Sequence, residues 1–260
     1  YGQVLFLAGG AGSGKGFAVS NFLEGGKFKI RDVDEIKKAV LKLAALKNKY
    51  SEIRGLDLRR PKDVEKLHLF VKKKGFKEKS LDLILSQAKA GKMPNLLFDV
   101  TMKDKESITD ILPSLVNAGY DPRNIHLVWV LTNYEIAVKQ NRQRARIVPD
   151  DILLSTHEGA ANTMYNFIRR GTPKAVNGSV HIILGGKEHT IFWKDPKTGK
   201  PYDGKDGRIA VKDFKYLTIK EPGKKMTSEK SLLSQVSKWI MDNIPRSLKT
   251  KGIFGSAQKG

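Results

Sequence analysis

The sequence contains no cysteine. This absence excludes disulfide bonds, cysteine-ligated zinc and thiol catalysis. No stretch reaches the roughly 18 apolar residues that a membrane helix requires, and the first residues lack the basic and apolar regions of a secretory signal. Because a chain without cysteine fits a reducing compartment, we expect a cytoplasmic protein that does not bind membranes.

Acidic residues are scarce relative to basic ones. The 260 residues include 48 lysines and arginines against 27 aspartates and glutamates, which gives a net charge of +21. A positive field of this size attracts polyanions and steers anionic substrates. The lysines are spread along the chain, however, which also fits a generally basic surface. Charge alone therefore leaves nucleic-acid binding open.

Short apolar runs alternate with helical patterns in the first two thirds of the chain. The apolar run at 4–7 predicts a buried strand, and further strands are expected over 28–33, 95–100 and 125–131. Helices are expected over 17–23, 105–117 and 150–169, with further basic helices within 51–93. This alternation predicts an α/β fold with a mostly parallel sheet between two layers of helices.

The pattern changes at residue 177. Strands expected over 180–184, 190–193 and 216–219 are separated by glycine-rich and Asp-Pro turns, and a helix is expected over 228–241. We predict a core over 1–176, a β-hairpin-rich insertion with a closing helix over 177–243, and a flexible basic tail over 244–260.

A glycine-rich loop follows the first predicted strand and precedes a predicted helix. It consists of Gly9, Gly10, Ala11, Gly12, Ser13, Gly14, Lys15 and Gly16. Glycines let the backbone N–H groups approach a polyphosphate, and the helix N-terminus adds a positive dipole end. Lys15 would reach the β- and γ-phosphates. The spacing and context predict a phosphate-binding loop, or P-loop, for a nucleoside triphosphate.

One position departs from the usual P-loop pattern. A serine or threonine normally follows the lysine and helps to hold Mg²⁺, whereas this chain has Gly16. Either water and a carboxylate hold the metal, or metal binding and turnover are weakened.

Acidic residues stand where the second and third predicted strands end. Ligands of doubly wound sheets bind at the carboxyl ends of strands, so Asp32, Asp34 and Asp99 are candidate site residues. Asp34 could remove the proton from an acceptor hydroxyl, or could cap the following helix. Asp32 and Asp99 are candidates for metal contact, and Asp99 with Thr101 for acceptor binding. For Asp99 and Thr101, the alternative role is the formation of a turn.

Three arginines precede Val148-Pro149. Arg142, Arg144 and Arg146 suit a lid that closes over the triphosphate, because arginine stabilises the charge of a phosphoryl group in transfer. A solvated basic helix is the alternative. His157, on the next predicted helix, is expected to be structural.

Taken together, these pieces resemble the zeta-toxin family of P-loop kinases, which is related to polynucleotide-kinase-like phosphotransferases. The matching segments are 9–15, Asp-Val-Asp-Glu-Ile-Lys at 32–37, Phe-Asp-Val-Thr at 98–101 and Ala-Arg-Ile-Val-Pro at 145–149. The resemblance covers about residues 3–170, and the order of the segments carries it.

The resemblance implies ATP- or GTP-dependent phosphorylation of a hydroxyl, with Mg²⁺, on a nucleotide sugar or a nucleic-acid 5′-end. It implies that Lys15 binds phosphate, that Asp34 is the general base and that Asp99 and Thr101 line the acceptor pocket. Arg146 resembles the γ-phosphate arginine, with Arg142 as a second one. A non-catalytic binding module with a degenerate P-loop is the competing interpretation, favoured by Gly16.

Overall fold

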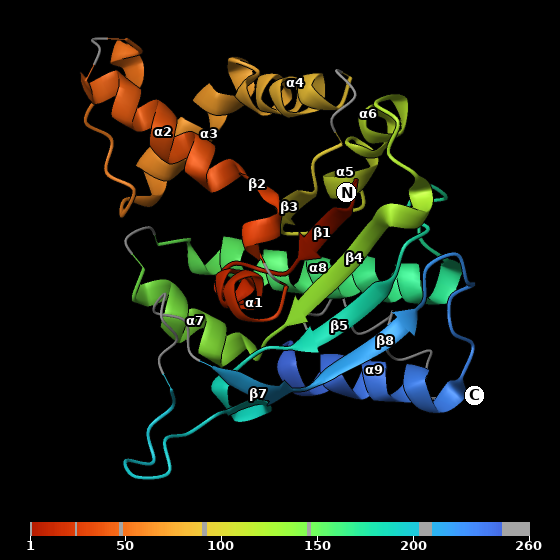
Figure 1. Cartoon of the computed structure of the whole chain (residues 1–260). Helices are drawn as coiled ribbons and strands as arrows, with labels where there is room; N and C mark the ends of the chain where they lie inside the picture. The colour runs from red at the N-terminus through yellow and green to blue at the C-terminus, as the bar shows by residue number, and fades with distance from the viewer. Residues whose placement is uncertain are drawn as a thin grey trace.

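A six-stranded sheet forms the centre of the molecule. The computed structural model describes residues 2–23, 25–46, 49–89, 93–144, 147–202 and 210–245 of the chain. The strand order is β2-β3-β1-β4-β5-β8. The strands are β1 (Val4–Ala8), β2 (Lys29–Asp32), β3 (Leu96–Val100), β4 (Ile125–Leu131), β5 (Val180–Leu184) and β8 (Tyr216–Lys220). All pairs are parallel except β5 with β8, so the predicted mostly parallel sheet is confirmed (Figure 1).

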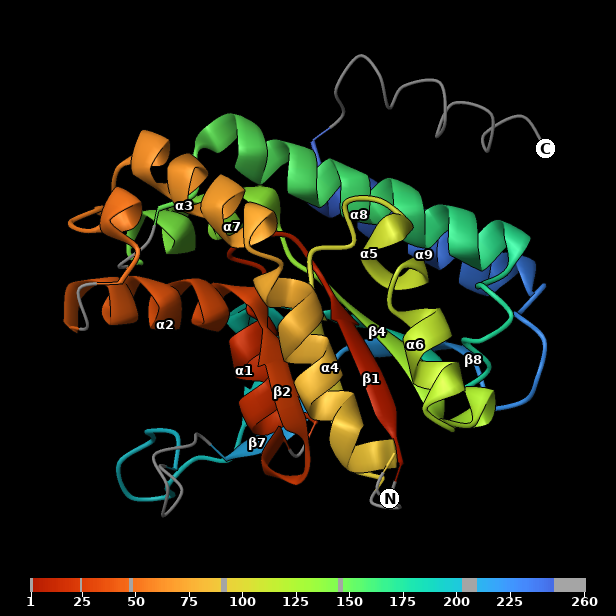
Figure 2. The ribbon, with the colours of Figure 1, turned by 90° about the horizontal axis from the view of Figure 1, so that it is seen from above.

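Alternate residues of β1 enter two different hydrophobic cores, as the two-residue period of a strand requires. Val4, Phe6 and Ala8 pack with α4 (Phe76–Lys89), α8 (Asp150–Arg170) and α9 (Lys230–Asn243). Leu5 and Leu7 pack with α1 (Lys15–Asn21) on the opposite face. Helices therefore cover both faces of the sheet, as the sequence predicted (Figure 2).

A helical layer lies beyond the β2 edge of the sheet. It comprises α2 (Val33–Leu46), α3 (Pro61–Lys73) and α4, and Figure 1 shows these helices together. Val40, Leu67 and Phe70 belong to a third hydrophobic cluster between them. Pro61 is the first residue of α3, where the missing backbone N–H costs nothing.

The helix predicted over 105–117 is in fact two short helices. They are α5 (Glu106–Thr109) and α6 (Leu112–Asn117). Pro113 in the first turn of α6 has no N–H to bond the carbonyl of Thr109, and its ring would clash with that carbonyl in a continuous helix. The chain therefore breaks between the two helices.

An antiparallel hairpin projects from the carboxyl end of β5. It pairs β6 (Thr190–Phe192) with β7 (Val211–Phe214), a strand that the sequence did not predict. Phe214 stacks on Phe22 just beyond α1 at 4.0 Å, and Phe192 meets Phe17 edge-on at 6.3 Å. These ring contacts attach the hairpin to the helix that follows the phosphate loop.

The remaining described element of the C-terminal region is α9, which closes the fold near its predicted place. The domain boundaries at 176 and 243 stay predictions, and nearly all of the predicted basic tail lies outside the described residues. Among the helices of the described segments, none combines the length and apolar character needed to cross a membrane.

Candidate functional site

The glycine-rich loop connects β1 to α1 at the carboxyl edge of the sheet. Gly12 and Gly14 have φ angles of 72° and 83°, in the left-handed region that favours glycine. At Gly12 a Cβ atom would also lie 2.6 Å from the carbonyl oxygen of Ala137 in α7 (Tyr134–Arg142). Both glycines are therefore needed for the shape of the loop.

Two buried side chains hold the loop from outside. Thr132, just after β4, donates a 2.6 Å hydrogen bond from its hydroxyl to the carbonyl oxygen of Ser13. His157 on α8 donates from Nε2 to the carbonyl oxygen of Ala11 at 2.8 Å. Burial lowers the pKa of His157, while the hydrogen bond to Ala11 acts in the opposite direction. His157 thus has the structural contact expected of it.

Lys15 connects the loop to the third strand. Its Nζ donates to the carbonyl oxygens of Gly9 and Gly10 at 2.7 and 3.3 Å, and it lies 3.4 Å from Oδ1 of Asp99. Burial raises the pKa of Asp99, while the charge of Lys15 acts in the opposite direction. The Lys15 ammonium and the buried Asp99 carboxylate therefore meet beside the phosphate loop.

The acids at the end of β2 have different local roles. Asp32 accepts a 2.7 Å hydrogen bond from the backbone N–H of Asp34, and α2 begins at Val33. Asp32 is therefore the residue that caps α2, and the alternative that Asp34 is the cap is wrong. Asp34 lies in the first turn, with its carboxylate 3.5 Å from Nζ of Lys37 and about two fifths exposed, at 39%.

Strand register brings two of the acids together. Asp32 and Asp99 are direct partners in the parallel β2–β3 ladder, and the charge of Asp32 is one of the causes that raise the pKa of Asp99. Thr101 follows β3 and is exposed, and the next residue, Met102, is buried with a left-handed φ of 56°. The predicted acceptor residues Asp99 and Thr101 thus lie at the end of β3, just before a residue with left-handed backbone.

The arginine segment lies between α7 and α8. Arg142 ends α7 and pairs with Asp150 at 3.7 Å, with both side chains about two thirds exposed. Arg144 is also exposed, and Arg146 lies outside the described residues. The described contacts therefore place the Arg142 side chain beside the start of α8 rather than at the phosphate loop.

Asn141 is a residue of this segment that the sequence analysis missed. It is fully buried and its side-chain amide bonds both the carbonyl and the N–H of Val148, at 2.7 and 3.0 Å. These two bonds hold Val148 against the end of α7. The sequence signal for Asn141 was weak, because it consists only of a polar residue on the apolar face of α7. The signal for Thr132, at the end of β4, was similarly weak.

Metal ligands in the described part of the chain are few. No group of three or more histidine, aspartate or glutamate side chains converges there. Mg²⁺ commonly takes one or two carboxylates and completes its shell with water and substrate phosphates. The neighbouring carboxylates of Asp32 and Asp99 fit that incomplete donor set. At Gly16 a Cβ atom would meet nothing within 4 Å, so the missing hydroxyl leaves open space.

No family model and no curated protein matches the sequence. Solved structures match at the level of fold. The crystal structure of AvrRxo1-ORF1:AvrRxo1-ORF2 with sulphate ions gives a TM-score of 0.52 at 11% identity, covering 99% of this chain and 76% of the other. The corresponding structure with ATP gives 0.51 at 10% identity, with the same coverage. The shared fold is an α/β fold with a mostly parallel sheet between helices.

This likeness extends over the C-terminal region, which the resemblance in sequence did not reach. A structure from the PezAT chromosomal toxin-antitoxin system of Streptococcus pneumoniae also matches, with a TM-score of 0.45 at 18% identity. That match covers 70% of this chain, which spans 66% of the matched one.

Proposed function

We propose that the protein is a phosphotransferase that moves the γ-phosphoryl group of ATP or GTP to an acceptor hydroxyl. The observation that supports this most is the position of Lys15. Its ammonium touches the loop carbonyls on one side and the Asp99 carboxylate on the other. A group in that position can bridge a bound triphosphate to the acids at the ends of β2 and β3.

The proposed mechanism begins with the nucleotide on residues 9–16. The loop N–H groups and the start of α1 bind the phosphate oxygens, and Lys15 turns from the carbonyls of Gly9 and Gly10 to the β- and γ-phosphates. Asp34 takes the proton of the acceptor hydroxyl as its oxygen attacks the γ-phosphorus. The bond to the β,γ-bridging oxygen breaks, and the nucleoside diphosphate leaves.

The remaining predicted residues have supporting roles in this proposal. Asp99 and Thr101 orient the acceptor, while Arg146, with Arg142 and Arg144, stabilises negative charge on the phosphoryl group. Asp32 and Asp99 would hold Mg²⁺ through carboxylate oxygens or water. When bound, the cation would neutralise charge on the phosphates.

Two acceptor classes remain. A nucleotide sugar follows from the resemblance to zeta toxins. A nucleic-acid 5′-hydroxyl is favoured by one observation on the hairpin: Trp193 and Tyr202 are exposed at 53% and 44%, and Nζ of Lys212 lies 5.1 Å from the Trp193 ring centre. Exposed aromatic rings beside lysines suit stacking with bases and contact with phosphates.

The test is transfer of label from γ-labelled ATP and GTP, with Mg²⁺, into UDP-sugars or 5′-hydroxyl oligonucleotides. Lys15→Ala and Asp34→Asn should each reduce transfer by at least about 100-fold, the scale of losing one group that acts in the transition state. Lys38→Ala and Glu35→Gln remove an exposed ion pair in the same helix as Asp34 and serve as matched controls. No transfer into either pool, despite nucleotide binding, would favour a non-catalytic module.

Gly16→Ser addresses that alternative directly. The open space at Gly16 admits the side chain, so the variant can offer the missing hydroxyl to Mg²⁺. We expect ATP affinity to rise several-fold in Mg²⁺ and to stay unchanged in EDTA, measured by calorimetry. An equal gain in Gly16→Ala would show that helix propensity, not metal ligation, causes the change.

A further inference from the structure

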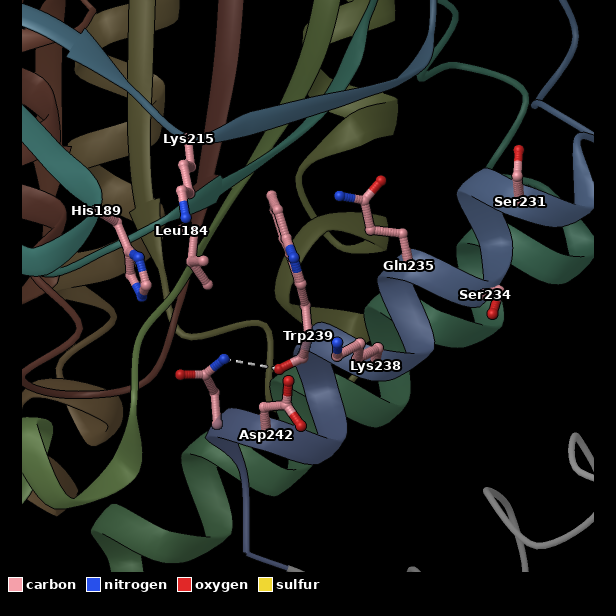
Figure 3. A pocket seen from close by; sticks show the side chains of 10 residues that line it. Leu184, His189, Lys215, Ser231, Ser234, Gln235, Lys238, Trp239 and Asp242 are labelled. Atoms are coloured by element: carbon pink, nitrogen blue, oxygen red, sulfur yellow. Dashed lines mark hydrogen bonds between the residues drawn. The ribbon is translucent and has the colours of Figure 1, made fainter.

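A pocket lies between the base of the hairpin and α9. Its volume is about 560 Å³, a size that suits a small organic ligand. Leu184 at the end of β5, His189 and Lys215 line one side, and α9 lines the other (Figure 3). Backbone bonds from Lys215 to His189 and from Leu184 to Lys215, at 3.1 and 2.9 Å, fix the first side. The pocket is thus built on the sheet rather than on a free loop.

Ser231 and Asn243 bond to neighbours along the chain, whereas Lys215, Gln235, Lys238 and Asp242 are exposed to water. Among the described residues, no hydrogen bond or ion pair involves the side-chain polar atoms of Lys215, Gln235, Lys238, Trp239 or Asp242. His189 adds a buried Nδ1 atom that has no hydrogen-bond partner in the described part of the chain. Buried polar atoms in proteins are normally satisfied. The unpaired Nδ1 atom of His189 therefore indicates a polar ligand group beside it, and the exposed Lys215 and Lys238 are free to contact the same ligand.

The charges of these groups narrow the chemistry of the ligand. Two ammonium groups, on Lys215 and Lys238, match the two negative charges that a phosphate monoester carries near neutral pH. The Asp242 carboxylate can only accept, so the ligand must also present a donor such as a hydroxyl. The Trp239 indole extends from α9 toward the sheet and supplies a flat wall (Figure 3). We propose that this pocket binds a small phosphate monoester with hydroxyl groups, of the sugar-phosphate class.

This assignment is independent of the phosphotransferase, and the test separates the two. Ribose 5-phosphate is titrated into a Lys15→Ala, Trp193→Phe background, which removes the key phosphate-loop cation and the exposed hairpin indole. The remaining tryptophans are Trp239, which lines the pocket, and Trp129, which is 1% exposed in the core. A change in fluorescence therefore reports on the pocket.

We expect a saturable change with a midpoint below about 1 mM, the limit of a weak specific complex. Lys215→Gln and Lys238→Gln should each raise that midpoint at least 10-fold. Lys212→Gln, on the same hairpin but directed at Trp193, should leave it unchanged, and so should Lys230→Gln at the start of α9. Asp242→Asn should weaken ribose 5-phosphate while leaving inorganic phosphate unaffected. Thermal melting confirms that each variant folds.

Three results would overturn the proposal. The first is a change that does not saturate. The second is equal weakening by Lys212→Gln, which would indicate general attraction of anions to a basic surface. The third is equal binding of ribose or of gluconate, which would show that the pocket does not select the phosphate. Loss of phosphoryl transfer in Lys15→Ala has no bearing on any of them.

Discussion

Nε2 of His157 lies 2.8 Å from the carbonyl oxygen of Ala11, so a helix far along the chain holds the phosphate loop. A carbonyl oxygen only accepts, and the proton must therefore sit on Nε2. Gly10 completes the contact, because a Cβ atom there would lie 2.3 Å from the His157 ring. The absence of a side chain at Gly10 therefore lets the loop pack directly against the His157 ring.

Replacing His157 with alanine should destabilise the protein by about 1–3 kcal/mol, because a buried hydrogen bond is lost and a cavity remains. Nucleotide affinity should fall as well. Denaturant unfolding and calorimetry measure the two effects. His181→Asn is the control, since His181 is half-buried and bonds Thr218 away from the loop. An unchanged nucleotide affinity in His157→Ala would contradict the positioning role.

The burial of His157 predicts a pH dependence. Burial lowers the pKa of His157 below its value in the unfolded chain. The stability from the neutral ring is therefore complete above the unfolded pKa of about 6.5 and is lost as pH falls through the folded pKa. The stability difference between the wild type and His157→Gln should shrink on going from pH 7 to pH 5. A constant difference would show that the His157 ring has the same pKa in the folded and the unfolded protein.

Three glycine-to-alanine changes in the loop should give graded effects. Gly10→Ala should cost the most, roughly 1–3 kcal/mol, because the new Cβ meets the buried His157 ring. Gly14→Ala meets no atom within 4 Å but has a left-handed φ of 83°, which costs roughly 1 kcal/mol. Gly16→Ala has neither problem and should be neutral or slightly stabilising in α1. Urea midpoints test this order.

Asp99→Asn should stabilise the protein at neutral pH. Burial raises the pKa of Asp99 above its unfolded value, so the ionised carboxylate favours the unfolded state. Protonated Asp99 contributes to the stability of the folded protein. This contribution is complete below the unfolded pKa and is lost as pH rises through the folded pKa. Melting temperatures at pH 4 and pH 8 should therefore show a larger advantage for the variant at pH 8. A larger advantage at pH 4 would mean that pairing with Lys15 outweighs burial.

Asn141→Ala should destabilise the protein by about 2–4 kcal/mol, since both backbone groups of Val148 lose their partner in a buried site. Trypsin should also cleave after Arg142 and Arg144 faster, because loss of these bonds loosens the backbone beside these exposed side chains. Asn166→Ala is the control, because the Asn166 amide bonds a carbonyl within its own helix at 2.9 Å. Equal protease sensitivity in both variants would show that the Asn141 bonds do not hold this backbone in place.

The sequence predicted the sheet well because long apolar runs decide buried strands. The strands at 125–131 and 180–184 have their predicted bounds. β7 could not be predicted in this way. Its residues Val211 to Phe214 are not fully buried, and pairing with β6 rather than an apolar run makes them a strand.

The site was harder to predict than the fold. Loop glycines and strand-end acids have a fixed place in the sequence pattern, and Asp32 and Asp99 do lie together through strand register. Which acid caps α2 depends on where the helix begins within one or two residues, a boundary that sequence patterns do not fix. The support from Thr132 and His157 joins residues more than a hundred positions from the loop, and no local pattern records such contacts.

Gly185, directly after β5, has its Cα so close to Thr132 and Ser13 that a Cβ atom would lie 2.2 Å from the Thr132 hydroxyl. The phosphate loop is synthesised well before its supports at 132, 157 and 185, which follow more than a hundred residues later. Until residue 185 has been synthesised, the nascent chain lacks part of the structure that holds the phosphate loop in shape. A nascent chain therefore acquires its nucleotide site only after β5 has emerged and joined the sheet, and ribosome-bound chains ending before that strand should not be retained on immobilised ATP.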